Sequence, residues 1–151
     1  MKAKFMLIAA LLLTTVGLLP KFSLAVEEYS QPAAGGYDVV AQFKHKIVRG
    51  DGLKASNYEG KTYLFSSDEN KVAFEKDPAH YAPQYGGWCA FGASVNKKFH
   101  GDPTVYAVVN DKLYYNVNPA IALKWNLDQK GNIAKADANW PKIQDKDPAS
   151  L

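Results

Sequence analysis

The stretch that most constrains this chain is residues 81–92, Tyr-Ala-Pro-Gln-Tyr-Gly-Gly-Trp-Cys-Ala-Phe-Gly. It holds the single cysteine of the sequence, Cys89, and the glycine pair Gly86-Gly87. One cysteine cannot cross-link its own chain, so the fold depends on packing and not on an internal disulfide. The many aromatic residues of the chain supply the apolar mass for that packing.

Residues 1–25 have the three parts of a secretory signal peptide. Lys2 and Lys4 precede an apolar run over residues 5–19, and small residues lead to an expected cleavage site after Ala25. The run is shorter than the ~20 residues that a membrane-spanning helix needs, so a retained anchor is the weaker interpretation. We therefore expect a periplasmic or secreted protein that leaves the membrane after cleavage.

The formal net charge of +3 belongs to this leader, because Lys2, Lys4 and Lys21 would be removed and no acidic residue with them. In the remaining chain basic and acidic residues balance. Bulk charge therefore does not predict binding to nucleic acid or to an anionic membrane. The remaining length suits one domain with one core.

The residue pattern predicts a small single domain of the α+β class, with short antiparallel hairpins packed against several short helices. We expect a flexible lead-in over residues 26–35, the folded domain over 36–143 and a frayed tail over 144–151. No internal repeat is evident in the sequence.

Two turns rich in Gly, Asn and Asp punctuate β-forming residues and predict the hairpins. Ser66 and Glu69 have the spacing of a capping box, which predicts a helix start. The expected elements are a helical turn or irregular segment at 37–43, a strand at 45–48, a hairpin turning at 59–61, a helix at 66–76 with Val72 and Phe74 in the core, a turn capped by Asp77, a helix at 88–95, a hairpin turning at 110–111, a helix capped by Asn118 and a last helical turn at 133–140.

Several of these motifs resemble the YHS-domain pattern, and more narrowly that of exported bacterial YHS proteins. They are Gly-Tyr-Asp-Val-Val-Ala at 36–41, Tyr-Leu-Phe-Ser-Ser at 63–67, Tyr-Gly-Gly-Trp-Cys-Ala at 85–90, Lys-Leu-Tyr at 112–114 and Ala-Asn-Trp-Pro at 138–141. The resemblance spans about residues 36–140 and implies a YHS-like fold. YHS domains of metal-handling proteins carry cysteines near the first turn and at a strand-to-helix junction. Here Tyr37-Asp38 and residues 66–70 stand at those places, without the thiols.

Cys89 admits several interpretations. It can be a buried, inert thiol, because cysteine is among the most often buried residues. It can also be a soft-metal ligand, for which copper or another transition metal is the natural candidate in an exported protein. An intermolecular disulfide or a redox thiol is a further alternative. Catalysis by Cys89 would need a histidine base that the fold brings close, and the three histidines stand in polar surroundings, so an enzyme is disfavoured.

The residues around Cys89 are candidates for a ligand site. Tyr81, Tyr85 and Trp88 either belong to the core or form the wall of a cleft for a small ligand. The Gly86-Gly87 pair either forms a turn with positive φ or lets a ligand approach the backbone. Asp38 either caps a helical turn or lines a pocket with Tyr85 and Cys89.

The sequence thus favours a non-catalytic binding or accessory module of the YHS type. The candidate ligand site comprises Asp38, Tyr81, Tyr85, Gly86, Gly87, Trp88 and Cys89, with Cys89 as the candidate metal ligand. The alternative is a structural or protein-interaction domain in which Cys89 is buried and inert. A metal ion, a small ligand or a partner protein are the expected partners.

Overall fold

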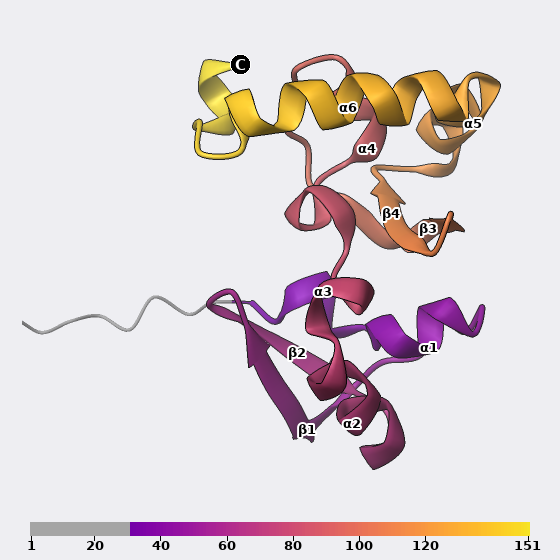
Figure 1. The fold of residues 1–151 in the computed structure, drawn as a ribbon, viewed down its shortest axis with the longest axis vertical. Coiled ribbons are helices and arrows are strands. Elements are labelled where there is room, and N and C mark those ends of the chain that lie inside the picture. Colours follow the sequence, from indigo (N-terminus) through magenta and orange to yellow (C-terminus); the bar gives the residue numbers. More distant parts are fainter. Residues whose placement is uncertain (1–30) are drawn as a thin grey trace, which may run out of the picture.

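The computed structural model describes residues 31–151. The predicted signal peptide and the first part of the predicted lead-in lie outside the described residues. The described chain forms two lobes stacked along the long axis, with the N-terminal half in one and the C-terminal half in the other (Figure 1). None of the helices over 31–151 is long and apolar enough to cross a membrane.

The first lobe has six elements around one two-stranded antiparallel sheet. They are η1 (Ala33–Gly36), α1 (Val39–Phe43), β1 (Asp51–Tyr58), β2 (Lys61–Phe65), α2 (Asp68–Lys76) and α3 (Pro78–Tyr81).

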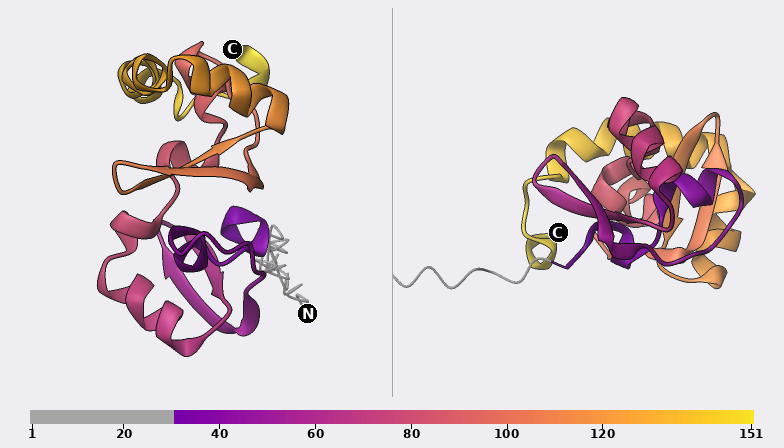
Figure 2. Two further views of the ribbon diagram at one scale, coloured as in Figure 1. Left: turned by 90° about the vertical axis from the view of Figure 1, so that its right-hand side faces the viewer. Right: turned by 90° about the horizontal axis from the view of Figure 1, so that it is seen from below.

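The second lobe has the same kind of sheet and a longer helical layer. Figure 2 shows the β3–β4 hairpin between the first lobe and the helices α5 and α6. The elements are η2 (Gln84–Gly87), α4 (Ala90–Ser94), β3 (Asp102–Val109), β4 (Lys112–Asn116), α5 (Pro119–Leu127), α6 (Gln129–Ile143) and η3 (Pro148–Ser150). The predicted α+β fold with two antiparallel hairpins is confirmed.

The second lobe repeats the first, contrary to the expectation of no internal repeat. Five consecutive elements recur with every start and end shifted by 51 residues: η1 as η2, α1 as α4, β1 as β3, β2 as β4 and α2 as α5 (starts 33 to 84, 39 to 90, 51 to 102, 61 to 112 and 68 to 119). Both hairpins also shift register at the same place, between Asp51 and Ala55 in one and between Asp102 and Tyr106 in the other.

The repeat extends to individual hydrogen bonds. Asp38 N donates to Val48 O at 3.0 Å, and its equivalent Cys89 N donates to Phe99 O at 2.8 Å. The amide of Gly50 donates to Gly36 O at 2.9 Å, and Gly101 N likewise donates to Gly87 O at 3.2 Å. Because these long-range hydrogen bonds recur 51 residues apart, the two halves have the same backbone arrangement.

Capping side chains start the helices, as several sequence signals predicted. Asp38 accepts from Ala41 N to begin α1, and Asp77 and Asn118 cap α3 and α5, each followed by proline. The cap of α2 is Ser67, which accepts from Asn70 N, and not the predicted Ser66. Ser66 instead binds Asp38 through its own amide and hydroxyl.

Two expectations for the first lobe were wrong. Residues 45–48 form no strand, and Ile47 is 53% exposed, because the partner strand β2 pairs with residues further along, in β1. Residues 33–35, assigned to a flexible lead-in, form most of η1, which packs against the core through Ala33 and Ala34.

The core joins the two lobes. Leu113 and Tyr115 of β4 pack in one cluster with first-lobe residues that include Phe65 and Phe74. Val72, which was expected in this core beside Phe74, is 47% exposed. A second core cluster lies within the second lobe and consists of Tyr85, Ala90, Ala93, Tyr114, Trp125 and Ala136.

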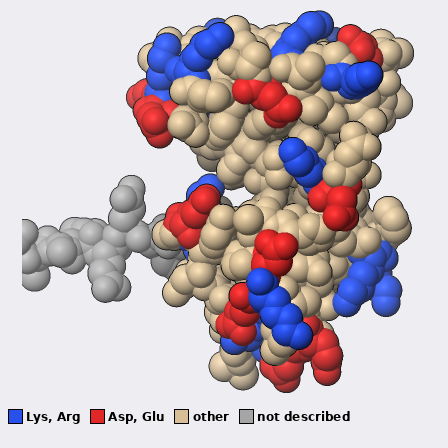
Figure 3. All heavy atoms as spheres, in the orientation of Figure 1, with Lys and Arg blue, Asp and Glu red and all other residues tan. Residues whose placement is uncertain are grey.

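A buried hydrogen-bond chain ties the lobes at the same junction. The Tyr115 hydroxyl donates to Gln42 Oε1 at 2.7 Å, and Gln42 Nε2 donates to Pro103 O at 2.7 Å. Gln42 belongs to α1, whereas the other two residues belong to β3 and β4. Figure 3 shows the molecule narrowing at this junction, with charges of both signs interspersed over the visible face.

Candidate functional site

The turn η2 sets the backbone geometry of the candidate site. Tyr85, Gly86 and Gly87 have φ of 54°, 61° and 87°, so the prediction that the glycine pair forms a turn with positive φ is confirmed. Glycine adopts this region without the steric cost that a side chain meets. Tyr85 adopts it although it has a side chain, and its equivalent Ala34 does the same at φ 53°.

Tyr85 is anchored by its hydroxyl group. The hydroxyl donates to Asp137 Oδ1 on α6 at 2.8 Å. Burial first, and then the hydrogen bond to Asp137, raise the pKa of Tyr85 above its ordinary value. A neutral tyrosine bound to a carboxylate at its far end fixes the turn against α6.

Cys89 begins α4 and is 1% exposed. Gly92 N donates to its Sγ at 3.4 Å, so the thiol serves as a helix cap. The thiol in turn lies 3.5 Å from Asn116 Oδ1, which also accepts from Phe91 N at 3.2 Å. The structure thus places Cys89 as a free, buried thiol between a helix start and β4.

The described residues do not assemble a metal-ligand set around this thiol. Over residues 31–151 no group of three or more His, Cys, Asp or Glu side chains is placed to hold a metal ion. His100 stacks on Trp88, with ring centroids 4.3 Å apart, and His80 packs against Tyr81 at 4.5 Å. The ligand role of Cys89 stays a prediction. The described groups in contact with its sulfur are the peptide N–H of Gly92 and the side-chain amide oxygen of Asn116.

Asp38 stands in the first lobe where Cys89 stands in the second. It is fully buried, and its carboxylate accepts from Ala41 N at 3.0 Å, from Ser66 N and Oγ at 2.8 and 2.6 Å, and from Asn70 Nδ2 at 2.7 Å. Burial alone would raise its pKa, but the hydrogen bonds from Ser66 and Asn70 outweigh burial and hold the pKa below its usual value. Asp38 is therefore an ionised helix cap, and it lines none of the cavities described next.

A cavity of about 620 Å³ lies at the junction of the two lobes, with both repeated turns in its wall. This volume is in the range of small-molecule sites. Gly86, Gly87 and Trp88 line it, and so bring together three of the seven residues predicted for a ligand site. The described lining residues are Gln31, Pro32, Ala33, Ala34, Gly35, Lys61, Tyr63, Pro83, Gly86, Gly87, Trp88, His100, Gly101, Pro103 and Tyr115.

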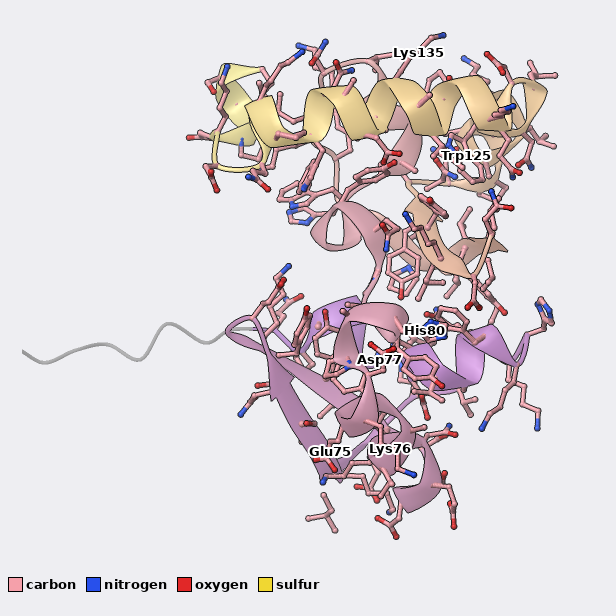
Figure 4. All side chains as sticks on the ribbon, viewed as in Figure 1. Glu75, Lys76, Asp77, His80, Trp125 and Lys135 are labelled. Atoms are coloured by element: carbon pink, nitrogen blue, oxygen red, sulfur yellow. The ribbon has the colours of Figure 1, made fainter. Side chains whose placement is uncertain are left out.

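The other predicted site residues lie elsewhere. Tyr85 lines a smaller depression of about 320 Å³ on the α6 side of η2, with Asp137 and Trp140. Tyr81 borders an open groove of about 710 Å³ along α2 and α3, which includes the labelled residues Lys76, Asp77 and His80 (Figure 4). Cys89, like Asp38, borders none of these three spaces.

The sequence missed the polar residues of the junction cavity. Lys61 and Tyr63 come from β2, and His100 precedes β3, so all three lie outside the stretch at residues 81–92. The signal that points to them is the repeat. Because η1 and η2 are equivalent turns, the residues that pack on one turn indicate which residues surround the other.

Comparison with known proteins bears on the first lobe. The family model of the YHS domain matches residues 51–85, from β1 to Tyr85. No curated protein and no solved structure matches the chain. The matched segment contains Tyr63-Leu-Phe-Ser-Ser, one of the motifs on which the resemblance was based. Over residues 51–85 the chain is therefore similar to the YHS domain.

Proposed function

We propose that this chain is an exported, non-catalytic binding module of the YHS type that holds a small ligand in the junction cavity. The observation that carries the proposal is the cavity itself, which both turns η1 and η2 line. The signal-peptide pattern of residues 1–25 supports a periplasmic or secreted location.

The chemistry of the lining supports binding over catalysis. Among the described lining residues His100 is the one imidazole, and there is no thiol and no carboxylate. Nucleophilic catalysis needs a nucleophile with an adjacent base, and general acid–base catalysis needs groups in complementary roles. The walls instead offer proline, alanine and aromatic surface, which suits the uptake of an apolar ligand body.

A metal module centred on Cys89 is the less supported form of the same function. The sulfur is buried and already caps α4. A copper site there would require an imidazole to replace the Asn116 contact. An interaction domain with an inert Cys89 is the alternative, favoured by this burial and by Leu123 and Leu127 of α5, which are 69% and 88% exposed.

The experiment is a screen of small aromatic and aliphatic acids, amides and amines against the purified protein, observed by ligand NMR. Ala33 lines the cavity, so Ala33→Trp should obstruct it and weaken any hit by about tenfold or more. Gln84 occupies the equivalent position of η2 and does not line the cavity. Gln84→Trp is therefore the matched control and should bind as the wild type does.

Three results would contradict the proposal. The wild-type protein could bind no member of the screen, or its hits could bind Ala33→Trp equally well. Stoichiometric copper uptake that Cys89→Ser abolishes would place the site at the thiol instead.

A further inference from the structure

The junction cavity has basic residues and no carboxylate among its described lining residues. Lys61 and His100 line it, and no aspartate or glutamate is among its described lining residues. Lys61 Nζ lies 3.1 Å from Gly86 O and so is directed toward η2. An ammonium group has three donors, and this bond uses one of them, so donors remain for a ligand. Among the described lining residues, the positive charge of Lys61 thus has no carboxylate to balance it.

The hydroxyl group of Tyr63 is a further hydrogen-bond donor of the lining. Tyr63 is 4% exposed and lines the cavity, and no described residue hydrogen-bonds its hydroxyl. The one fully buried side-chain N or O atom without a partner in residues 31–151 is Trp125 Nε1. The Tyr63 hydroxyl is not such an atom, and Tyr63 as a residue lines the cavity.

The protonation state of Tyr63 suits a donor role. Burial raises its pKa to about 12, with a smaller contribution from the charge of Glu59. The hydroxyl is therefore neutral at physiological pH and can donate to an anion. No described residue hydrogen-bonds this hydroxyl, so we expect it to be available to a ligand atom in the cavity.

The remaining walls are flat and apolar. Trp88 stacks on His100 with an interplanar angle of 22°, and Pro32, Pro83 and Pro103 line the same space. Such surfaces favour a planar or compact apolar body by burial and by aromatic stacking.

We propose that the junction cavity binds a small organic carboxylate with a flat apolar body. This proposal rests on the proposed function and names its ligand class. The carboxylate interacts with Lys61 and His100 and accepts from the Tyr63 hydroxyl, while the apolar body lies against Trp88 and the prolines. An amine of the same shape is repelled by Lys61, and a neutral amide loses the charge-assisted bonds.

The test compares naphthylacetate, naphthylacetamide and naphthylethylamine, which differ in the polar group on one flat body. Binding is followed by the NMR signals of the tryptophan indoles, with Trp88→Phe assigning the Trp88 signal. The acid should bind wild-type protein about threefold to tenfold more tightly than the amide, and the amine most weakly.

The repeat supplies matched control variants. Lys61→Gln and Tyr63→Phe should each remove most of the preference for the acid over the amide, while leaving amide affinity within about twofold. Lys112 and Tyr114 are the equivalent residues of β4 and line none of the cavities described above. Lys112→Gln and Tyr114→Phe should keep the preference.

The outcomes separate the two proposals. Equal binding of acid and amide, or a preference that survives Lys61→Gln, overturns the carboxylate class but leaves the cavity as a ligand site. Absence of binding by all three probes and by every member of the wider screen overturns both proposals. Binding that persists in Ala33→Trp places the ligand outside the cavity and also overturns both.

Discussion

Asp38 and Cys89 are equivalent residues that perform the same local task with different chemistry. Each caps a five-residue helix by accepting the amide three residues later, Ala41 N in one case and Gly92 N in the other. The surroundings decide which residue fits. Asp38 has three further donors from Ser66 and Asn70, whereas the sulfur of Cys89 faces the carbonyl oxygen of Asn116. A buried carboxylate needs donors, but a thiol tolerates an acceptor.

This difference predicts that two substitutions of Cys89 change the free energy of unfolding by different amounts. Cys89→Ser keeps a capping group and a donor toward Asn116, so the free energy of unfolding should change by no more than about 1 kcal/mol. Cys89→Asp buries a charge beside the Asn116 oxygen and should lower that free energy by about 3 kcal/mol or more. Urea unfolding measures both.

Comparable stability of the two variants would mean that the thiol is not enclosed as described. A second readout uses the wild type, in which a thiol reagent should modify Cys89 only as fast as the protein opens. Rapid modification of the native protein would count against the buried cap.

At the scale of elements, each lobe has a glycine at which the chain passes very close to the second strand of the hairpin. Gly50 and Gly101 occupy equivalent positions just before β1 and β3. A Cβ on Gly50 would lie 2.5 Å from Leu64 Cβ, and a Cβ on Gly101 would lie 2.5 Å from Tyr115 Cβ. Leu64 and Tyr115 are themselves equivalent. Both lobes therefore need glycine at this position for the same steric reason. The same glycines donate to η1 and η2, so they connect each turn to its hairpin.

Alanine at these glycines should therefore be costly. We expect Gly50→Ala and Gly101→Ala each to lower the free energy of unfolding by about 2 kcal/mol or more, because backbone and Cβ atoms must move apart. Gly52 lies two residues further along and would meet nothing within 4 Å. Gly52→Ala, measured by the same thermal unfolding, should be nearly neutral. If all three variants melt together with the wild type, the close crossing does not exist.

At the scale of the whole molecule, the two lobes share a core and do not form separate domains. Leu113 and Tyr115 from β4 complete the cluster around Phe65 and Phe74 of the first lobe. The Tyr115–Gln42–Pro103 chain crosses the junction within the same layer. Because residues of the second lobe complete the core cluster of the first, the first lobe cannot bury its core alone.

We therefore expect one cooperative unfolding transition, with tryptophan fluorescence from the second lobe and hydrogen exchange in α2 of the first lobe reporting the same free energy. Tyr115→Phe removes the donor to Gln42 and should lower that free energy by about 1–3 kcal/mol in both readouts. Tyr106→Phe, on the half-buried β3, is the control with little expected effect. Separate transitions for α2 and the tryptophans would contradict the shared core.

The amino-acid sequence alone determined the local structure wherever a short motif fixes the backbone. The caps Asp38, Asp77 and Asn118 were predicted correctly, because a side-chain acceptor next to free helical amides acts within four residues. The positive φ of Gly86-Gly87 and the hairpin at 110–111 were also predicted, because these turns depend on the residues that form them. The α+β class with two antiparallel hairpins was predicted from the same kinds of local motif.

The tertiary structure alone decided which surfaces meet. Residues 45–48 have β-forming character, yet β2 pairs with β1, because strand pairing is settled by the partner and not by propensity. The repeat was missed, because only scattered positions such as Gly50 and Gly101 keep the same residue. Other equivalent positions, such as Asp38 and Cys89, share only a backbone role. The junction cavity with Lys61, Tyr63 and His100 exists only because the two repeated lobes pack against each other. Contacts between the lobes leave no periodic pattern in the sequence.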